Sequence, residues 1–209
     1  MQKTAGRLAA RPNIRFSYLP LSFYHTLSNV LSAVPEFVAV LRPPKLPFVV
    51  SAENGTLEVQ KNLISSGELI GHVVRLFVHD ELAEGKHIEI APFSESLSFI
   101  NDESTLRRVL VNAVKNALEA APEGSTVSIG FGGGSSAIEF FVHNDGTMDE
   151  SVRSNIFRRY FSTKGGNRGL GTYSMKLMTE EYLGGEVSFR SSEQEGTTFI
   201  VVIPNRGAG

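Results

Sequence analysis

The chain has 209 residues, of which 41% are hydrophobic and 20% are charged, and its formal net charge is −2. This composition predicts a globular protein with one main core, and the small net charge gives no global attraction to nucleic acid or to a membrane surface. The sequence contains no cysteine, which excludes disulfide bonds and thiolate metal sites and fits a cytoplasmic location.

Residues 1–50 form an N-terminal region that is less regular than the rest. No acidic residue precedes Glu36, whereas four basic residues do: Lys3, Arg7, Arg11 and Arg15. We interpret this stretch as a solvated basic arm; a transit-like leader and a patch for an acidic partner are the alternatives. One or two short helices are expected within 19–41, before a break marked by prolines 43, 44 and 47. No apolar run reaches the ~20 residues that a membrane-spanning helix needs.

Residues 52–206 are predicted to form the main domain. A turn is expected at 52–55, and the alternation of 56–60 predicts a short strand. Apolar residues with helical spacing predict a helix over 66–82, capped by Ser65 or Ser66. Two strands are then expected at 87–91 and 96–100.

A helix is predicted over 102–121, with Asn101 or Asp102 as its N-cap. Its apolar stripe consists of Leu106, Val109, Leu110, Ala113 and Ala117. Asn112, Asn116 and Glu119 follow at i, i+4 and i+7 on the flank beside that stripe. A solvated helix edge is one interpretation. The other is a row of amide oxygens directed at a hard cation and its phosphates, because Mg²⁺ prefers oxygen ligands.

The remaining pattern alternates strands with helices. Strands are predicted at 126–131 and 137–142, joined by a glycine-rich hairpin loop, and again at 186–191 and 197–203. Helices are predicted near 150–158 and over 170–182. Asn144-Asp145-Gly146 has the composition of a type I′ hairpin turn, which is the alternative to a functional loop. Mostly antiparallel strands with helices gathered on one face indicate the α+β class.

The stretch DESTLRRVLVNAVKNALEA, residues 102–120, resembles the N box of the ATPase domain of sensor histidine kinases. That superfamily also includes DNA gyrase, a heat-shock chaperone and the MutL mismatch-repair proteins. The resemblance implies a two-layer α/β sandwich of the Bergerat type, preceded by a short helical region. It further implies that Asn116 is the Mg²⁺ ligand, that Asn112 contacts phosphates, and that Lys115 is a supporting charge.

The residue type at the position of Asn112 differs between the branches of this superfamily. The gyrase, chaperone and MutL branches carry a Glu at the equivalent position, four residues before the metal-binding Asn, where it activates water. An amide cannot accept a proton from water, so Asn112 favours phosphoryl transfer over hydrolysis. The same substitution disfavours the anti-sigma-factor serine kinases, which resemble the Glu-bearing pattern.

Further motifs resemble the remaining boxes of that domain. Asn144 and Gly146 match its first glycine box, usually Asp-x-Gly-x-Gly, with Asn144 facing the adenine amino group and Thr147-Met148 lacking the second glycine. Residues 156–165 resemble the F box, residues 168–174 the second glycine box, and residues 195–199 the closing glycine box. The ATP-binding residues implied by these boxes are Asn144, Gly146, Lys164, Arg168, Gly169, Leu170, Gly171, Thr172 and Thr198. Physically, Gly169 and Gly171 would let backbone N–H groups approach phosphates at a helix N-terminus.

Residues 23–29, FYHTLSN, resemble one variety of the histidine kinase H box. This resemblance implies that His25 is the phosphoacceptor. Thr26 stands where that box usually has Asp or Glu. Only residues 26–51 separate His25 from Ala52, fewer than the usual two-helix hairpin requires. An ordinary helix or loop histidine is the alternative for His25.

The leading hypothesis is a two-component sensor histidine kinase that binds Mg·ATP and transfers the γ-phosphoryl group to His25 or to a histidine of a partner. A response-regulator receiver domain is the expected partner, and a homodimer is expected if the N-terminal helices are competent. A nucleotide-binding scaffold or regulator without kinase activity is the alternative. An ATPase of the gyrase or MutL kind is the least favoured hypothesis.

Overall fold

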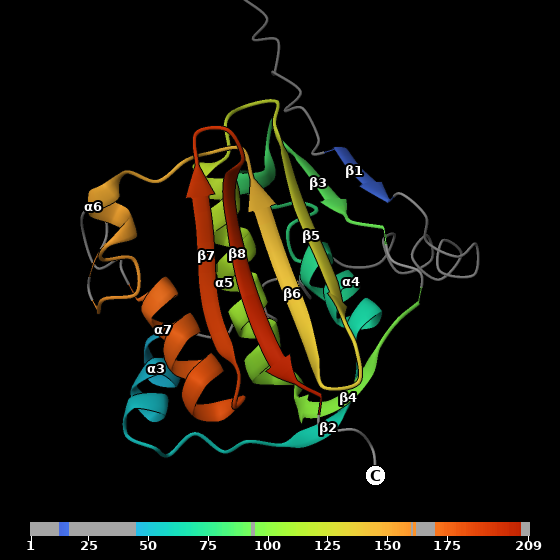
Figure 1. Cartoon of the computed structure of the whole chain (residues 1–209), viewed down its shortest axis with the longest axis vertical. Helices are drawn as coiled ribbons and strands as arrows, with labels where there is room; N and C mark the ends of the chain where they lie inside the picture. Colours follow the sequence, from blue (N-terminus) through green and yellow to red (C-terminus); the bar gives the residue numbers. More distant parts are fainter. Residues whose placement is uncertain (1–12, 17–44, 93–94, 160, 162–169, 206–209) are drawn as a thin grey trace, which may run out of the picture.

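The computed structural model describes residues 13–16, 45–92, 95–159, 161 and 170–205. A six-stranded sheet with the order β1-β3-β5-β6-β8-β7 forms one layer, and helices cover one of its faces (Figure 1). Its strands are β1 (Asn13–Phe16), β3 (His87–Ile90), β5 (Thr126–Gly133), β6 (Ala137–Asn144), β7 (Glu186–Ser192) and β8 (Gly196–Pro204). Strand pairs β1–β3 and β3–β5 are parallel, and the pairs from β5 to β7 are antiparallel.

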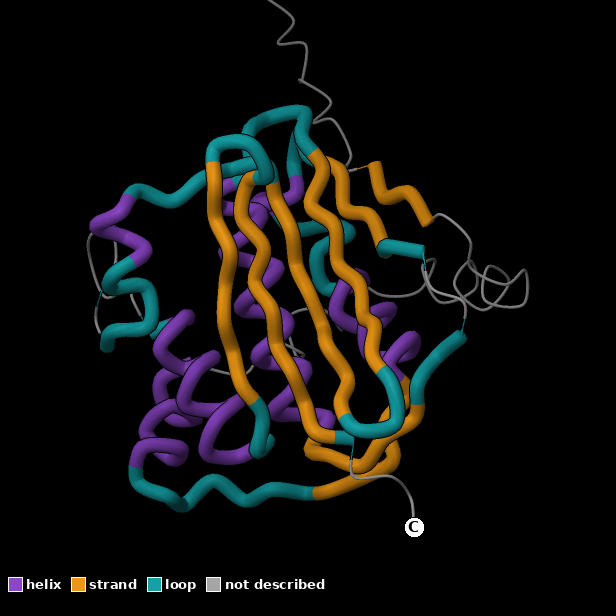
Figure 2. The backbone as a smooth tube through the Cα atoms, in the orientation of Figure 1, coloured by secondary structure: helices purple, strands orange, loops and turns teal. Residues whose placement is uncertain are grey.

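A second, two-stranded sheet lies at the lower edge of the view and pairs β2 (Lys61–Ser65) with β4 (Ser98–Asp102) in antiparallel orientation. The helical elements are α3 (Lys45–Glu53), α4 (Ser66–Arg75), η1 (Glu81–Ala83), α5 (Glu103–Ala120), α6 (Glu150–Arg153), α7 (Gly171–Leu177) and η2 (Met178–Tyr182). In Figure 2 the helices α4 and α5 lie behind the large sheet, and α7 lies to the left of its β7 edge. The predicted α+β sandwich of two layers is therefore confirmed.

The central helix α5 supplies most of the contact between the layers. Its predicted apolar stripe is buried, with each of Leu106, Val109, Leu110 and Ala117 at 0% exposure. The facing strand β6 buries every second residue, Ile138, Phe140, Val142 and Asn144, because strand side chains alternate between the two faces. The even-numbered positions of β6 therefore face the helices, and the odd-numbered positions lie on the open face.

The caps predicted for two helices are confirmed. Asp102 is 4% exposed and its Oδ1 accepts a hydrogen bond of 2.6 Å from the backbone N–H of Thr105, while its Oδ2 accepts one of 2.6 Å from Gln60. The hydroxyl of Ser65 accepts from the N–H of Glu68 at the start of α4. Such side-chain acceptors satisfy backbone donors that have no partner within the helix.

Several sequence-based element boundaries are wrong. Residues 56–60 form no strand; pairing begins at Lys61, where β2 meets β4. Helix α4 ends at Arg75 instead of continuing to 82. The predicted break near Pro47 is part of helix α3, because proline is tolerated in a first turn, where backbone N–H groups lack intrahelical partners. The helices expected within 19–41 lie outside the described residues.

Candidate nucleotide-binding site

The two asparagines on the flank of α5 face helix α7. The amide nitrogen of Asn112 donates a hydrogen bond of 3.3 Å to the hydroxyl of Ser174. The amide nitrogen of Asn116 lies 3.8 Å from the sulfur of Met175. Both asparagines are half-buried, so the alternative of a solvated helix edge does not hold. Their nitrogens are directed at α7, and an amide oxygen on each remains as an acceptor.

The start of α7 lies beside the oxygen of Asn116. Gly171 is the first residue of α7, and a Cβ atom added to it would stand 3.9 Å from Asn116 Oδ1. The backbone at the start of α7 therefore lies close to the amide oxygen of Asn116. Leu170 precedes Gly171 as the N-cap and provides no side-chain capping bond for the first backbone N–H groups of α7.

The other predicted phosphate-binding residues are placed differently. The hydroxyl of Thr172 donates to the backbone carbonyl of Ile156, so it ties α7 to the segment after α6. Lys115 forms an ion pair with Glu119, one turn later on α5, at 3.4 Å. Lys164, Arg168 and Gly169 lie outside the described residues, as does His25.

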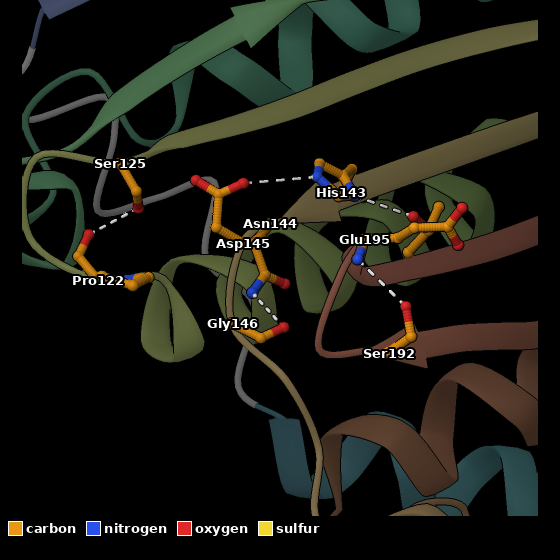
Figure 3. Close-up of polar contacts among 9 residues, drawn as sticks. Pro122, Ser125, His143, Asn144, Asp145, Gly146, Ser192 and Glu195 are labelled. Carbon is orange, nitrogen blue, oxygen red and sulfur yellow. Dashed lines mark hydrogen bonds and ion pairs between the residues drawn. The ribbon is translucent and has the colours of Figure 1, made fainter.

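Strand β6 ends with Asn144, which is 1% exposed on the helix side of the sheet. Its amide nitrogen donates to the carbonyl of Gly146 at 3.3 Å (Figure 3). Gly146 packs so closely against the end of α5 that an added Cβ would lie 2.4 Å from the carbonyl oxygen of Ala120. The chain then continues through residues 147–149 into α6, so the type I′ hairpin alternative is wrong.

The closing turn before β8 meets this loop. Gly196 has φ +69°, and a Cβ there would lie 2.3 Å from the carbonyl oxygen of Asn144. In the register of β6 and β8, Asn144 pairs with Thr197, and His143 pairs with Thr198. Thr197 is 2% exposed and its hydroxyl lies 2.8 Å from that of Ser191.

The predicted role of Thr198 in nucleotide binding is not supported by its place in the sheet. Its hydroxyl lies 3.0 Å from His143 Nδ1, on the open face away from the helices. Because strand side chains alternate, a shift of one residue moves a side chain to the other face. Thr197, on the face of Asn144, takes its place as the candidate.

Two candidate residues escaped the sequence reasoning, Ser174 and Thr197. Ser174 follows Gly171 by one helical turn, and this i, i+3 spacing is the signal that could have found it. The signal for Thr197 was its position in the final strand, because alternate residues of a strand face opposite sides of the sheet. Both hydroxyls are nearly fully buried, at 3% and 2% exposure.

One arginine near the site has a shifted pKa, and a groove lies elsewhere on α7. Burial lowers the pKa of the Arg108 guanidinium, one turn before Asn112, and Arg107 adds to the effect while Asp102 opposes it. A groove of about 470 Å³ lies on α7, lined by Ile156, Phe157, Tyr173 and Lys176 among others. None of Asn112, Asn116 and Asn144 lines this groove, so it is separate from the candidate site.

The described part of the chain contains no cluster of three or more His, Asp or Glu side chains suited to a metal ion. Among the same residues, no helix is long and apolar enough to cross a membrane.

Comparison with known proteins identifies the same region. Residues 101–207 match the profile of the histidine kinase-, DNA gyrase B- and HSP90-like ATPase family. The chain is 26% identical over 167 residues to the sensor histidine kinase CusS of Escherichia coli O157:H7, covering 77% of this chain and 34% of CusS. It is 29% identical over 204 residues to the sensor protein DegM of Bacillus sp. strain B21-2, covering 89% and 54%. The chain thus spans between a third and about half of these relatives.

Solved structures agree with these relatives. The catalytic domain of the histidine kinase ThkA, in a nucleotide-free form, superposes with a TM-score of 0.62 at 27% identity and covers 70% of this chain and 98% of that domain. The histidine kinase AdeS of Acinetobacter baumannii has a TM-score of 0.61 at 16% identity and covers 91% and 88%. The AdeS likeness concerns the fold alone.

Proposed function

Because the chain belongs to the histidine kinase-, DNA gyrase B- and HSP90-like ATPase family, and its relatives are sensor histidine kinases, we propose that it binds Mg·ATP and phosphorylates a histidine. The observation that carries the proposal is the placement of Asn116 Oδ1 beside Gly171 at the start of α7. An amide oxygen and uncapped backbone N–H groups there meet the requirements of a hard cation and of phosphate oxygens, respectively.

The proposed binding residues are arranged along α5. At its C-terminal end, Gly146 packs on Ala120 and brings Asn144 to the helix face, where its amide oxygen would accept a hydrogen bond from the adenine amino group. One and two turns earlier, respectively, Asn116 and Asn112 face the start of α7. Adenine would therefore bind near the end of α5, and the phosphates would extend toward Asn112. The bound magnesium ion would neutralise phosphate charge during the transfer.

In the proposed reaction, the bond from the γ-phosphorus to the bridging oxygen of ATP breaks and a phosphorus–nitrogen bond to histidine forms. ADP leaves, and the histidine ring nitrogen loses its proton. The acceptor is His25 or a histidine on a partner chain. A receiver domain of a response regulator would be the next acceptor, and dimerisation through the N-terminal region and a cytoplasmic location complete the proposal.

Asn112 supports phosphoryl transfer over hydrolysis. Its side chain donates to Ser174 and has no basic group with which to remove a proton from water. Hydrolysis of the gyrase kind lacks its base at this position. The Asn112→Glu variant would supply a carboxylate there, and sustained phosphate release from that variant alone would support this assignment.

One observation favours a second candidate function, a nucleotide-binding regulator without kinase activity. Thr147-Met148 stands where the first glycine box usually has its second glycine, and the backbone N–H of Met148 donates to Ser191 Oγ at 3.0 Å. That bond holds this part of the loop against β7, in a loop that lacks the second glycine.

Two measurements separate these functions. Isothermal titration calorimetry with ATP and Mg²⁺ tests binding, and no binding at millimolar nucleotide would exclude both candidates. Incubation with γ-labelled ATP then tests transfer, with and without an added histidine kinase dimerisation domain. Acid-labile label that depends on Asn116 supports the kinase; binding without label supports the regulator. Label that persists in His25→Ala excludes His25 as the acceptor.

A further inference from the structure

His143 occupies a position that the proposed function does not use. It lies in β6 next to Asn144, but its side chain is on the open face of the sheet. Its Nδ1 is 3.0 Å from the hydroxyl of Thr198 in β8, and its Nε2 is 3.7 Å from Oδ1 of Asp145 (Figure 3). The ring therefore connects a core strand to the first residue of the loop that follows Asn144.

That loop determines how the amide of Asn144 is oriented. Asp145 links Asn144 to Gly146, whose carbonyl accepts the hydrogen bond from Asn144 Nδ2. With the nitrogen committed to Gly146, the oxygen is the group left for a ligand. An amide oxygen accepts from the 6-amino group of adenine, whereas an amide turned by half a rotation would present its nitrogen to a 6-oxo group.

The loop is held from two other sides by backbone contacts. Gly146 packs on the carbonyl of Ala120, and Gly196 packs on the carbonyl of Asn144. Both contacts limit movement toward the helix and toward the closing turn. Asp145 is itself 62% exposed, and on the open face its Oδ1 lies 3.7 Å from Nε2 of His143.

We propose that His143 is a positioning residue for base recognition, which holds the Asn144–Gly146 loop so that the site selects 6-aminopurine over 6-oxopurine nucleotides. This inference rests on the proposed binding of ATP. It assigns the selectivity to a side chain on the opposite face of the sheet, which touches no nucleotide and acts through Asp145 and Gly146.

The test compares the dissociation constants of ATP and inosine triphosphate, which carries a 6-oxo group in place of the 6-amino group. The wild type is expected to prefer ATP by about tenfold or more, because a site that pairs with one group leaves its polar atom unpaired with the other. In His143→Ala this preference is expected to fall by about two- to tenfold, the range for one or two ordinary hydrogen bonds. Thr198→Val, which removes the hydroxyl partner, should move the preference in the same direction.

His143→Asn provides a rescue, because its amide nitrogen can occupy the place of Nδ1 and keep the bond to Thr198. It should retain more of the preference than His143→Ala. Glu139→Ala, on the same strand and the same face, is the matched control and should leave both constants unchanged. Thermal unfolding of each variant identifies loss of fold, which would weaken both nucleotides equally and leave their ratio intact.

The outcomes are distinct. A wild type that binds both nucleotides equally, or a His143→Ala variant that is folded and keeps the full preference, overturns the inference and leaves ATP binding standing. A wild type that binds neither nucleotide overturns the proposed function together with this inference.

Discussion

The amide of Asn112 in α5 donates to the hydroxyl of Ser174 in α7 at 3.3 Å, and Ser174 donates onward to the carbonyl of Gly171 at 2.8 Å. Ser174 is only 3% exposed, so this relay is shielded from water. It joins the flank of the central helix to the first residue of α7. The position of the proposed phosphate-binding end of α7 is thus set by a residue of α5.

Replacing Ser174 with alanine should loosen this relay. We expect Ser174→Ala to lower the free energy of unfolding by about 1 kcal/mol and to weaken ATP binding by about two- to tenfold. Calorimetry and chemical denaturation measure the two effects. Ser188→Ala, at an exposed position of β7, is the control. Unchanged ATP affinity in Ser174→Ala would show that the relay does not position the site.

Asn116→Ala tests the proposed metal ligand. We expect the dissociation constant of ATP in the presence of Mg²⁺ to rise by about tenfold or more, equivalent to ~1.4 kcal/mol. In excess EDTA, wild type and variant should bind ATP almost equally, because the ion is then absent from both. Asn62→Ala, at an exposed position in β2, controls for the loss of an amide. An equal loss of affinity with and without Mg²⁺ would argue against a role in holding the ion.

Gly146→Ala tests the close packing of the adenine loop on α5. The new Cβ would lie 2.4 Å from the carbonyl oxygen of Ala120, which is backbone and cannot rotate away. We expect a loss of about 1–3 kcal/mol of stability, typical of overpacking, together with weaker ATP binding. Gly134→Ala is the matched control, since no atom lies within 4 Å of its added Cβ. Equal melting temperatures for the two variants would contradict this packing.

The ion pair between Glu53 in α3 and Arg159, at 2.8 Å, should stabilise the docking of α3. The Glu53 side chain is only 18% exposed, and its Oε1 is buried. A double-mutant cycle with Glu53→Gln and Arg159→Gln should give a coupling energy of about 0.5–1 kcal/mol, the upper part of the range for such pairs. The same cycle on the exposed pair Glu150–Arg153 should give less. Coupling no larger than that of the control would mean that the pair does not hold α3.

His72 should make the stability depend on pH. Burial is the main cause that lowers its pKa below 6.5, and Arg75 and Arg107 add to it, while Glu103 and Glu68 oppose the shift. The unfolded chain then binds the proton more readily than the folded one. His72 therefore contributes stability above its unfolded pKa that is lost as the pH falls through its folded pKa. Because its side chain is 46% exposed, the effect is small.

The measurement is chemical denaturation of the wild type and His72→Gln at several pH values on both sides of 6.5. The wild type should lose more stability than the variant as the medium becomes acidic. An NMR titration of His72 should show a midpoint below 6.5. A midpoint above that value would mean that Glu103 and Glu68 dominate, and the sign of the pH dependence would reverse.

The two-layer fold and the central helix were predictable because their signals are periodic. The apolar stripe of α5 and the alternation of β6 each repeat over several turns or residue pairs, and burial follows them. Local signals were less reliable. Residues 56–60 alternate as a strand does, yet Gln60 donates its N–H to the Asp102 side chain and ladder pairing starts only at Lys61. Long-range pairing with β4 decided this boundary, and no local pattern encodes it.

In the candidate site, too, periodic signals were reliable and local ones were not. Asn112 and Asn116 were placed correctly relative to each other because helix geometry fixes i, i+4 neighbours. Thr198 was misplaced because a one-residue difference in a strand reverses the face, and the motif has threonines at both 197 and 198. Only the register with β6 distinguishes them. The partners on α7, Ser174 and Met175, are far from α5 in the sequence and required the fold.

Besides burying Val49 in the core, helix α3 makes polar contacts through two neighbouring residues. Arg159 pairs with Glu53, and the hydroxyl of Tyr182 donates to the carbonyl of Ala52. These two contacts lie at opposite ends of the stretch from 159 to 182, which includes Gly171 and Ser174. A rotation of α3 would therefore act on Arg159 and Tyr182, the two ends of that stretch, at the same time. Helix α3 is thus joined to both ends of the stretch that contains the helix facing Asn112 and Asn116.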